Sequence, residues 1–204
     1  MRRSTTPTAP SSGTWGGRVG DLYLALLHHP VFDKNGAVVT TAVTNMDVHD
    51  IGRVSRTFGL RGFYVCTHVE TLRRLVARII RHWVSGPGAT YNQTRKEALS
   101  LVRQAPDLDA ALVDIEHETG QLPRLVATTA RDGDHRLSYD ALRRRLATDD
   151  RPELLVFGTG WGLTTDVLDR IDDVLEPIRG RDAYNHLSVR SAAAIILDRL
   201  RNDR

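Results

Sequence analysis

The sequence predicts an α/β protein with a mostly parallel β-sheet and helices on both faces. Short apolar runs recur along the chain and alternate with segments of helical period. One run, residues 154–157, is apolar at every position, as expected of a strand buried on both faces. A turn containing Gly158, Gly160 and Gly162 follows directly, and a helix is expected to begin after it at Thr164. Strand, glycine turn and helix is the usual geometry of a ligand site in this class of fold.

The length and composition suit a single soluble domain. The 204 residues are enough for a substantial core, and we expect one domain at residues 19–204. Residues 1–18 are rich in Ser, Thr, Pro and Gly, and we expect a disordered N-terminal tail there. The single cysteine, Cys66, indicates a reducing compartment. Because neither a signal peptide nor a membrane-spanning run is evident, we expect a cytoplasmic protein without a membrane partner.

The basic residues are almost all arginines. Of the 28 basic residues only Lys34 and Lys96 are lysines, and the formal net charge is +3. Guanidinium groups suit phosphates and RNA. Codon usage in a GC-rich genome would explain the same bias equally well.

The strands are predicted from the apolar runs, at residues 22–27, 62–66, 111–115, 125–128 and 154–157. A brief extended piece is expected at 173–177. Residues 38–43 are β-branched, so they form either an extended segment or a loop that crosses the site.

Helices are predicted from the periodicity, at about residues 47–58, 69–83, 93–104, 139–147, 167–171 and 188–200. Asp47 or Asp50 is expected to cap the first helix, and Gly59 to end it. The helix at 69–83 carries arginines opposite its apolar face, which suits either RNA or solvent. The last helix is apolar on more than one face, so it packs either on its sheet alone or on its sheet and a second subunit.

The residues of the glycine turn restrict its ligand. The turn lacks the Gly-Lys-Ser/Thr sequence of P-loops, and its alternating glycines differ from the dinucleotide-binding Gly-x-Gly-x-x-Gly. Asp166 would repel a phosphate at the start of the next helix. Because bare main chain can approach a ligand closely, the turn favours a neutral or cationic ligand. The alternative is a tight turn that binds nothing. No metal site is expected, since His117 and Glu118 lack a third ligand at suitable spacing.

Three segments carry a family resemblance. Residues 157–163 (Phe-Gly-Thr-Gly-Trp-Gly-Leu) and 184–192 (Tyr-Asn-His-Leu-Ser-Val-Arg-Ser-Ala) resemble the last two motifs of the SPOUT class of RNA methyltransferases. Residues 50–60 are similar to the first motif, with Arg53 six residues before Gly59. The resemblance covers roughly residues 20–202. It is greatest to a small stand-alone bacterial subfamily related to the tRNA guanine-N1 methyltransferases.

The resemblance implies a C-terminal trefoil knot (the SPOUT, or α/β-knot, fold). It also implies S-adenosyl-L-methionine as cofactor, tRNA or rRNA as substrate, and a homodimer formed through the C-terminal helix. Carried over by position, the cofactor-binding residues are Thr128, Thr129, Ala130, Phe157, Gly158, Thr159, Gly160, Trp161, Gly162, Leu163, Ile178, Asn185, His186 and Leu187.

The expected catalytic residues are Arg53, Asn45 and His186. Arg53 would orient RNA phosphate or assist proton loss from the nucleophile, with a helix-surface ion pair to Asp50 as the alternative. Asn45 would help to hold the acceptor, and His186 would accept a proton. Further candidates are His49 as a proton acceptor, and Tyr91 and Arg95 at the border of the substrate cleft.

The motifs also differ from the family pattern. His186 occupies the slot of the usual asparagine, with Asn185 displaced by one residue, and Asp47 occupies the slot of another. Neither a second domain nor the extended motif of a guanine-N1 enzyme is evident, so the target base and atom do not carry over. The prediction is an S-adenosylmethionine-dependent RNA methyltransferase. The alternative is a non-catalytic RNA-binding or assembly protein that keeps the fold and the cofactor pocket.

Overall fold

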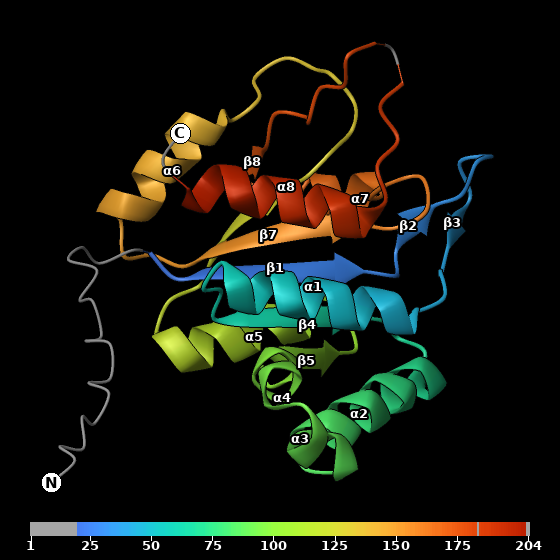
Figure 1. The fold of residues 1–204 in the computed structure, drawn as a ribbon. Coiled ribbons are helices and arrows are strands. Elements are labelled where there is room, and N and C mark those ends of the chain that lie inside the picture. The colour runs from blue at the N-terminus through green and yellow to red at the C-terminus, as the bar shows by residue number, and fades with distance from the viewer. Residues whose placement is uncertain (1–19, 183, 203–204) are drawn as a thin grey trace, which may run out of the picture.

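The computed structural model describes residues 20–182 and 184–202, and it centres on a six-stranded sheet (Figure 1). The expected tail at residues 1–18 lies outside these ranges. The strands stand in the order β5, β4, β1, β7, β6, β8, and each described pair is parallel. The strands are β1 (Leu22–Leu27), β4 (Gly62–Cys66), β5 (Val102–Ala105), β6 (Arg124–Ala127), β7 (Glu153–Gly158) and β8 (Asp173–Val174). The predicted α/β class with a mostly parallel sheet is confirmed.

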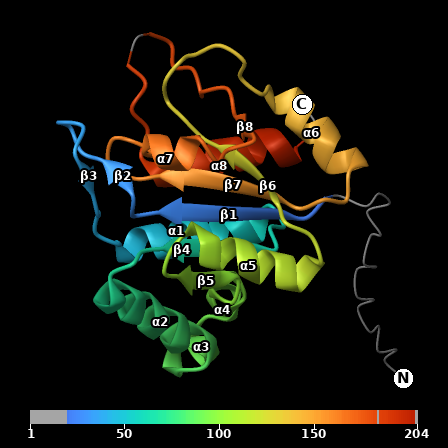
Figure 2. The same cartoon turned by 180° about the vertical axis from the view of Figure 1, so that it is seen from behind.

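Helices cover both faces of the sheet, as Figure 1 and Figure 2 show from opposite sides. The helices are α1 (Asn45–Thr57), α2 (Glu70–Val84), α3 (Pro87–Tyr91), α4 (Gln93–Leu99), α5 (Leu108–Thr119), α6 (Tyr139–Thr148), α7 (Thr165–Leu168) and α8 (Val189–Arg201). Side chains of α1, α6 and α8 pack on the face that carries Leu24 of β1, and those of α5 and α7 pack on the face that carries Ala25. Residues 154–157 of β7 are buried, as their apolar run predicted.

The strand predicted at residues 111–115 is wrong, because these residues belong to helix α5. The buried side chains of α5 follow a spacing of three and four residues, at Leu108, Ala111 and Ile115. Asp107 caps the helix through its side chain, and Gly120 ends it with a φ of 79°. A short apolar run fits either a strand or a buried helix face, and the cap residues resolve it.

The helix predicted at residues 93–104 is too long. Helix α4 ends at Leu99, and the residues beyond it form the edge strand β5, in which Val102 lies opposite Phe63 of β4. Only two of the four residues of β5 are buried. An edge strand of this kind has no continuous apolar run, which is why the periodicity did not reveal it.

Residues 38–43 form both of the expected structures, an extended segment followed by a loop. Val38 and Val39 form strand β3, which pairs with β2 (Val31–Phe32) in an antiparallel hairpin. The residues after Val39 form a loop that crosses the end of the sheet and leads to α1. Thr44 caps α1, since its hydroxyl accepts from the Asp47 amide at 3.1 Å, so the expected caps at Asp47 and Asp50 are wrong. Gly59 follows the helix with a φ of 69°, as predicted.

Candidate active site at the end of the sheet

The glycine turn lies where β7 ends, beside the end of β1. The amide and the hydroxyl of Thr159 both donate to the Leu27 carbonyl, at 3.2 and 3.0 Å. The Trp161 amide donates to the Phe32 carbonyl and the Phe32 amide donates to the Gly162 carbonyl, both at 2.9 Å. Main chain from β1 and β2 therefore fixes the turn at the carboxyl edge of a parallel sheet, where ligands bind in open α/β folds.

The glycines of the turn serve different purposes. A Cβ at Gly158 would lie 2.9 Å from the Leu163 nitrogen, and a Cβ at Gly160 would lie 2.8 Å from the Phe32 oxygen. Packing within the protein therefore explains these two glycines. Gly162 has a φ of 108°, and a Cβ there would meet nothing within 4 Å. Of the three glycines, Gly162 is thus the one at which the Cβ direction faces open space, so that a ligand can approach its Cα.

The three loops expected to hold the cofactor lie side by side. The Asn185 side-chain amide donates to the Ala130 carbonyl at 2.9 Å, and the Arg131 guanidinium donates to the Trp161 carbonyl at 3.4 Å. The Trp161 side chain itself is 56% exposed. These contacts bring the ends of β6 and β7 and the segment before α8 together at one edge of the sheet.

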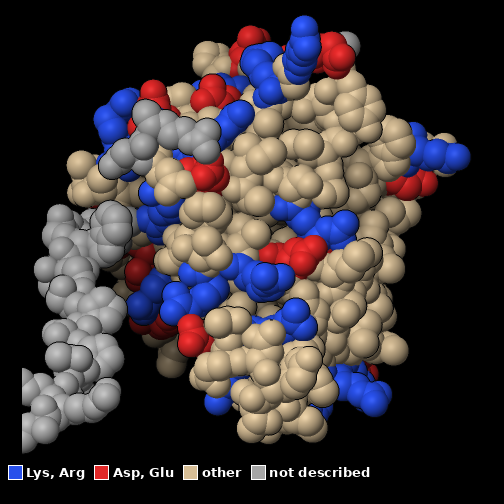
Figure 3. All heavy atoms as spheres, in the orientation of Figure 1, with Lys and Arg blue, Asp and Glu red and all other residues tan. Residues whose placement is uncertain are grey.

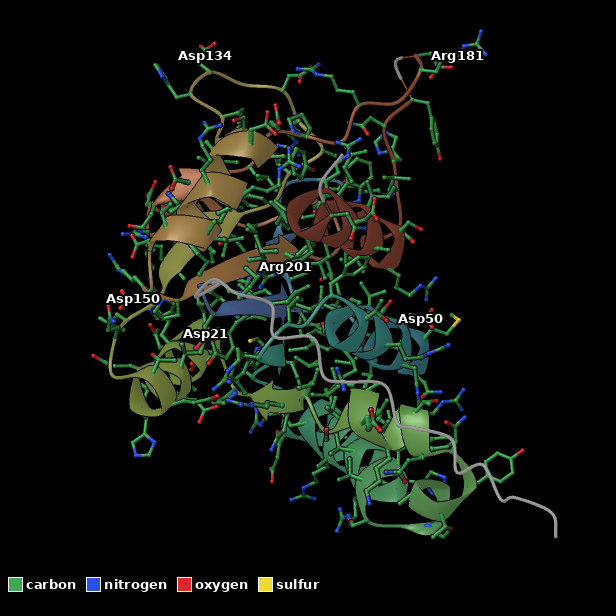
Figure 4. All side chains as sticks on the ribbon, turned by 60° about the vertical axis from the view of Figure 1, so that its left-hand side comes forward. Asp21, Asp50, Asp134, Asp150, Arg181 and Arg201 are labelled. Carbon is green, nitrogen blue, oxygen red and sulfur yellow. The ribbon has the colours of Figure 1, made fainter. Side chains whose placement is uncertain are left out.

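The long segment between β8 and α8 is held against the core at its start, and further along it forms a loop that projects from the molecule. The Glu176 carboxylate accepts from the Tyr139 amide at 2.9 Å, and Ile178 packs partly buried against the main core. Arg181 and Asp134 lie at the tips of two loops that extend outward on the same side of the molecule (Figure 4). Ile178, expected to contact the cofactor, thus contributes to the core.

The residues expected to be catalytic do not all meet. His186 is exposed, and its ring contacts the Tyr184 ring with centroids 5.4 Å apart. Asn45 and Arg53 instead line a groove between α1 and α2, and His186 is not among the residues that line it.

A partly buried ion pair joins helix α8 to helix α1. The Arg190 guanidinium lies 3.4 Å from the Asp47 carboxylate and 3.6 Å from the Asp50 carboxylate. Asp50 therefore pairs with α8 rather than with Arg53, and the alternative role expected for Arg53 is not observed. In the part of the chain that the structure describes, the Arg53 guanidinium makes no ion pair.

The groove between α1 and α2 has a volume of about 570 Å³. Its lining includes polar, basic and aromatic side chains, among them Asn45, His49, Arg53, Arg78, Trp83 and Arg95. Positive side chains gather across the middle of this face of the molecule (Figure 3). Arg95, expected at the border of the substrate cleft, lines this groove, whereas Tyr91 is 85% exposed and does not line it. Sequence reasoning placed Trp83 on an apolar face, and its place in the groove depends on packing between helices.

A buried histidine connects the glycine turn to the loop before α1. His28 follows β1 and is fully buried, and its Nδ1 lies 3.0 Å from the Thr41 hydroxyl. The Thr41 hydroxyl in turn lies 2.5 Å from the Thr159 hydroxyl. Burial lowers the pKa of His28 to about 4, with the Asp47 carboxylate opposing the shift. His28 is therefore neutral at neutral pH and positions the turn through Thr41.

The described residues fit a compact ligand held by main chain. Open space lies beside the Gly162 Cα, Trp161 next to it is exposed, and no lysine enters the turn. Within residues 20–182 and 184–202, no cluster of three metal-ligating side chains occurs, and no helix is long and apolar enough to cross a membrane.

The fold is shared with solved SPOUT methyltransferases. The SpoU methyltransferase AviRb from Streptomyces viridochromogenes superposes with a TM-score of 0.54 over 91% of this chain and 60% of its own. At 18% sequence identity this likeness concerns the fold alone. The strand order and the three clustered loops thus define an α/β protein of the fold that these structures share.

The chain belongs to the S-adenosylmethionine-dependent RNA methyltransferase family whose model matches residues 21–202. It is 50% identical over 183 residues to a protein of Oleidesulfovibrio alaskensis named tRNA (guanine-N(1)-)-methyltransferase. That match covers 90% of this chain but 42% of the relative, so the chain spans less than half the length of that relative. An uncharacterized protein of Aquifex aeolicus is 43% identical over 88% of each chain.

Proposed function

We propose that this protein transfers a methyl group from S-adenosyl-L-methionine to RNA. The observation that carries the proposal is the open space beside the Gly162 Cα, flanked by two other loops at the carboxyl edge of the sheet, in a chain of this family. When bound, the cofactor supplies an electrophilic methyl group on a sulfonium.

The residues that would hold the cofactor are those of the three clustered loops. Residues 158–162 would offer main-chain groups to it, and residues 128–130 and 185–187 would enclose it. Asn185 supports this arrangement, because its side chain ties the last loop to Ala130. Methyl transfer requires chiefly an aligned approach of the acceptor, so rigid positioning by these loops is their main contribution.

A trefoil knot of the C-terminal segment accompanies this proposal. Two observations support it. Leu175 bridges to Leu137 and Arg179 pairs with Asp132 at 2.9 Å, so the segment before α8 runs against the loop before α6. Helix α8 then packs on the same sheet face as α1 and α6.

Arg53 and Asn45 are the residues proposed to act on the RNA. Arg53 is exposed and unpaired by any described carboxylate, so its guanidinium is available for a phosphate. Asn45 begins α1 beside the loop that contacts the glycine turn, and its amide would orient the acceptor nucleotide. His186 remains a candidate proton acceptor at the other side of the loops.

We further propose a cytoplasmic homodimer formed through α8. Ala193 and Leu197 of α8 are buried in the subunit, whereas Ala194 and Ile195 are only partly buried and would pack on the partner. The name of the Oleidesulfovibrio relative makes tRNA the first substrate to test.

The direct test uses labelled cofactor. Radioactive methyl from S-adenosylmethionine should enter RNA from cells that lack the protein, and calorimetry should detect cofactor binding. Nucleoside mass spectrometry of that RNA then identifies the modified base. Cofactor binding without transfer into any RNA would favour the alternative, a non-catalytic RNA-binding protein.

A further inference from the structure

Three arginines face the groove between α1 and α2, and the described carboxylates leave them unpaired. Arg53 and Arg78 make no ion pair or side-chain hydrogen bond with any residue in the described ranges, and Arg95 makes no ion pair there. By contrast, the half-buried Arg103 is paired with Glu118 at 2.7 Å. The groove therefore holds positive charge that the protein itself does not neutralise.

Among the described residues, one acidic residue lines the groove, and it offsets only part of this charge. Asp50 lines the groove, but its carboxylate lies 3.6 Å from the Arg190 guanidinium, which also pairs with Asp47. Burial lowers the pKa of His49 in the groove, and the Arg95 guanidinium lowers it further, while the Asp50 carboxylate opposes the shift and Arg53 adds to it.

An aromatic floor holds one of the three guanidinium groups in place. The Arg95 guanidinium lies 4.5 Å from the centroid of Trp83, and its buried Nε has no hydrogen-bond partner in the described chain. The Trp83 ring is itself packed edge to face against His49 and His82, with centroids 5.5 and 5.0 Å away. A Cβ at Gly88 would lie 2.6 Å from this ring, so the floor is closely packed. A donor fixed in this way is ready for a ligand at little cost in side-chain entropy.

We propose that this groove binds the phosphate backbone of the substrate RNA next to the nucleotide that is methylated, an inference that rests on the proposed function. Guanidinium groups bind phosphate oxygens with charge-assisted, often bidentate hydrogen bonds. A volume of about 570 Å³ is in the range of sites for nucleotide-sized ligands. Asn45 lines the groove where α1 begins, directly after the loop whose Thr41 contacts Thr159 of the glycine turn, so this end of the groove is the one nearer in sequence to the cofactor loops. A second copy of this chain docked by the same face would oppose like charges, which disfavours it as the occupant.

The test compares two groove arginines, one on α2 and one on α4, with an arginine of α2 that lies outside the groove. Fluorescence anisotropy with fluorescein-labelled bulk bacterial tRNA is measured for the full chain, Arg78→Ala, Arg95→Ala and the control Arg81→Ala, which removes the same charge from α2 outside the groove. We expect at least about tenfold weaker binding for Arg78→Ala and Arg95→Ala, with the slope of log K against log salt reduced by about 1, and little change for Arg81→Ala. Arg95→Lys should recover part of the loss, and calorimetric affinity for S-adenosylmethionine and circular dichroism should be unchanged in all variants.

Several results would overturn the inference. The first is a loss of tRNA affinity for Arg81→Ala as large as that for Arg78→Ala and Arg95→Ala. The second is tighter binding of free AMP than of tRNA, or no tRNA binding by the wild-type chain. The third is a set of groove variants that change the molecular mass of the protein in light scattering but leave its tRNA affinity unchanged. If Arg78→Ala and Arg95→Ala bind and methylate RNA like wild type, the groove inference fails while the proposed function stands. If the variants lose tRNA affinity but the wild type transfers no methyl group, the groove stands and the enzymatic proposal fails.

Discussion

Thr41 and Thr159 join their hydroxyl groups at 2.5 Å across 118 residues of sequence. The Thr159 hydroxyl donates its proton to the Leu27 carbonyl, so Thr41 must be the donor to Thr159. The Thr41 oxygen must then accept from His28, which carries its proton on Nδ1. This tautomer leaves Nε2 unprotonated, consistent with its having no partner among the described groups. A chain of hydrogen bonds with one order of donors and acceptors therefore links β1, the loop before α1 and the glycine turn.

Thr41→Val tests that link. The substitution removes the donor to Thr159 while keeping the side-chain shape, so we expect S-adenosylmethionine affinity to fall by about five- to tenfold and the free energy of unfolding to fall by about 1–2 kcal/mol. Calorimetry and urea unfolding measure the two quantities. Thr40→Val is the matched control, because the Thr40 hydroxyl contacts His29 and not the turn. Equal cofactor affinity in the two variants would contradict the positioning role.

His28 predicts how stability depends on pH. Its pKa is lowered from 6.5 to about 4 in the folded protein, so between these values the unfolded chain takes up a proton that the folded chain does not. The contribution of His28 to the unfolding free energy is therefore fully present above about pH 6.5. It is lost as the pH falls toward 4, and the loss from this group is about 3 kcal/mol in total. Urea unfolding from pH 7 to pH 4.5 should show a shallower pH dependence for His28→Gln than for wild type. Parallel curves for the two proteins would rule out His28 as the source.

The sequence was informative where structure is set by neighbouring residues. The apolar run 154–157 and the glycines after it predicted strand β7 and its turn, and the apolar run at 22–27 predicted β1 with its bounds. Edge strand β5 was missed because its burial depends on β4. The basic groove could not be predicted either. It requires α1, α2 and α4 to pack together, and it requires Asp50 to pair with Arg190, which is 140 residues away in the sequence.

Gly162→Ala separates ligand access from backbone strain. Gly162 and Gly120 both have positive φ, 108° and 79°, and a Cβ at either would meet no atom within 4 Å. Gly120→Ala is the control for the effect of backbone conformation alone. Gly162→Ala and Gly120→Ala should each cost about 1–2 kcal/mol of unfolding free energy, because a side chain disfavours positive φ. We expect a fall of at least about tenfold in S-adenosylmethionine affinity for Gly162→Ala alone, since its methyl group would enter the space above the turn. Unchanged calorimetric affinity would show that the ligand does not approach there.

Arg53→Ala tests the catalytic assignment. We expect methyl transfer to fall by at least about tenfold while cofactor affinity stays unchanged, because the guanidinium would act on RNA and not on the cofactor. Arg56→Ala is the control on the same helix, since Arg56 pairs with Glu97 at the surface. Labelled transfer and calorimetry are measured on the same preparations. If Arg53→Ala transfers methyl groups at the wild-type rate, Arg53 has no role in the reaction.

Glu153→Ala tests the ion pairs that stabilise the end of the sheet opposite to the glycine turn. Glu153 is 1% exposed, and its carboxylate lies 2.7 Å from Arg145 and 3.3 Å from Arg124. Burial raises the pKa of Glu153, although both arginines oppose the shift. Its removal would take away the buried carboxylate that the two guanidinium groups share, leaving Arg124 with Asp149 and Arg145 with Asp173, and we expect a loss of about 2 kcal/mol in unfolding free energy.

The matched control for this loss is Glu70→Ala, which breaks an exposed pair with Arg74 and should change stability by less than about 0.5 kcal/mol. Both variants should bind S-adenosylmethionine normally when folded, because Glu153 begins β7 and the glycine turn lies at its other end. Equal losses in the two variants would mean that burial adds nothing to the Glu153 pair. A loss of cofactor affinity in folded Glu153→Ala would mean instead that strain at the start of β7 reaches the turn.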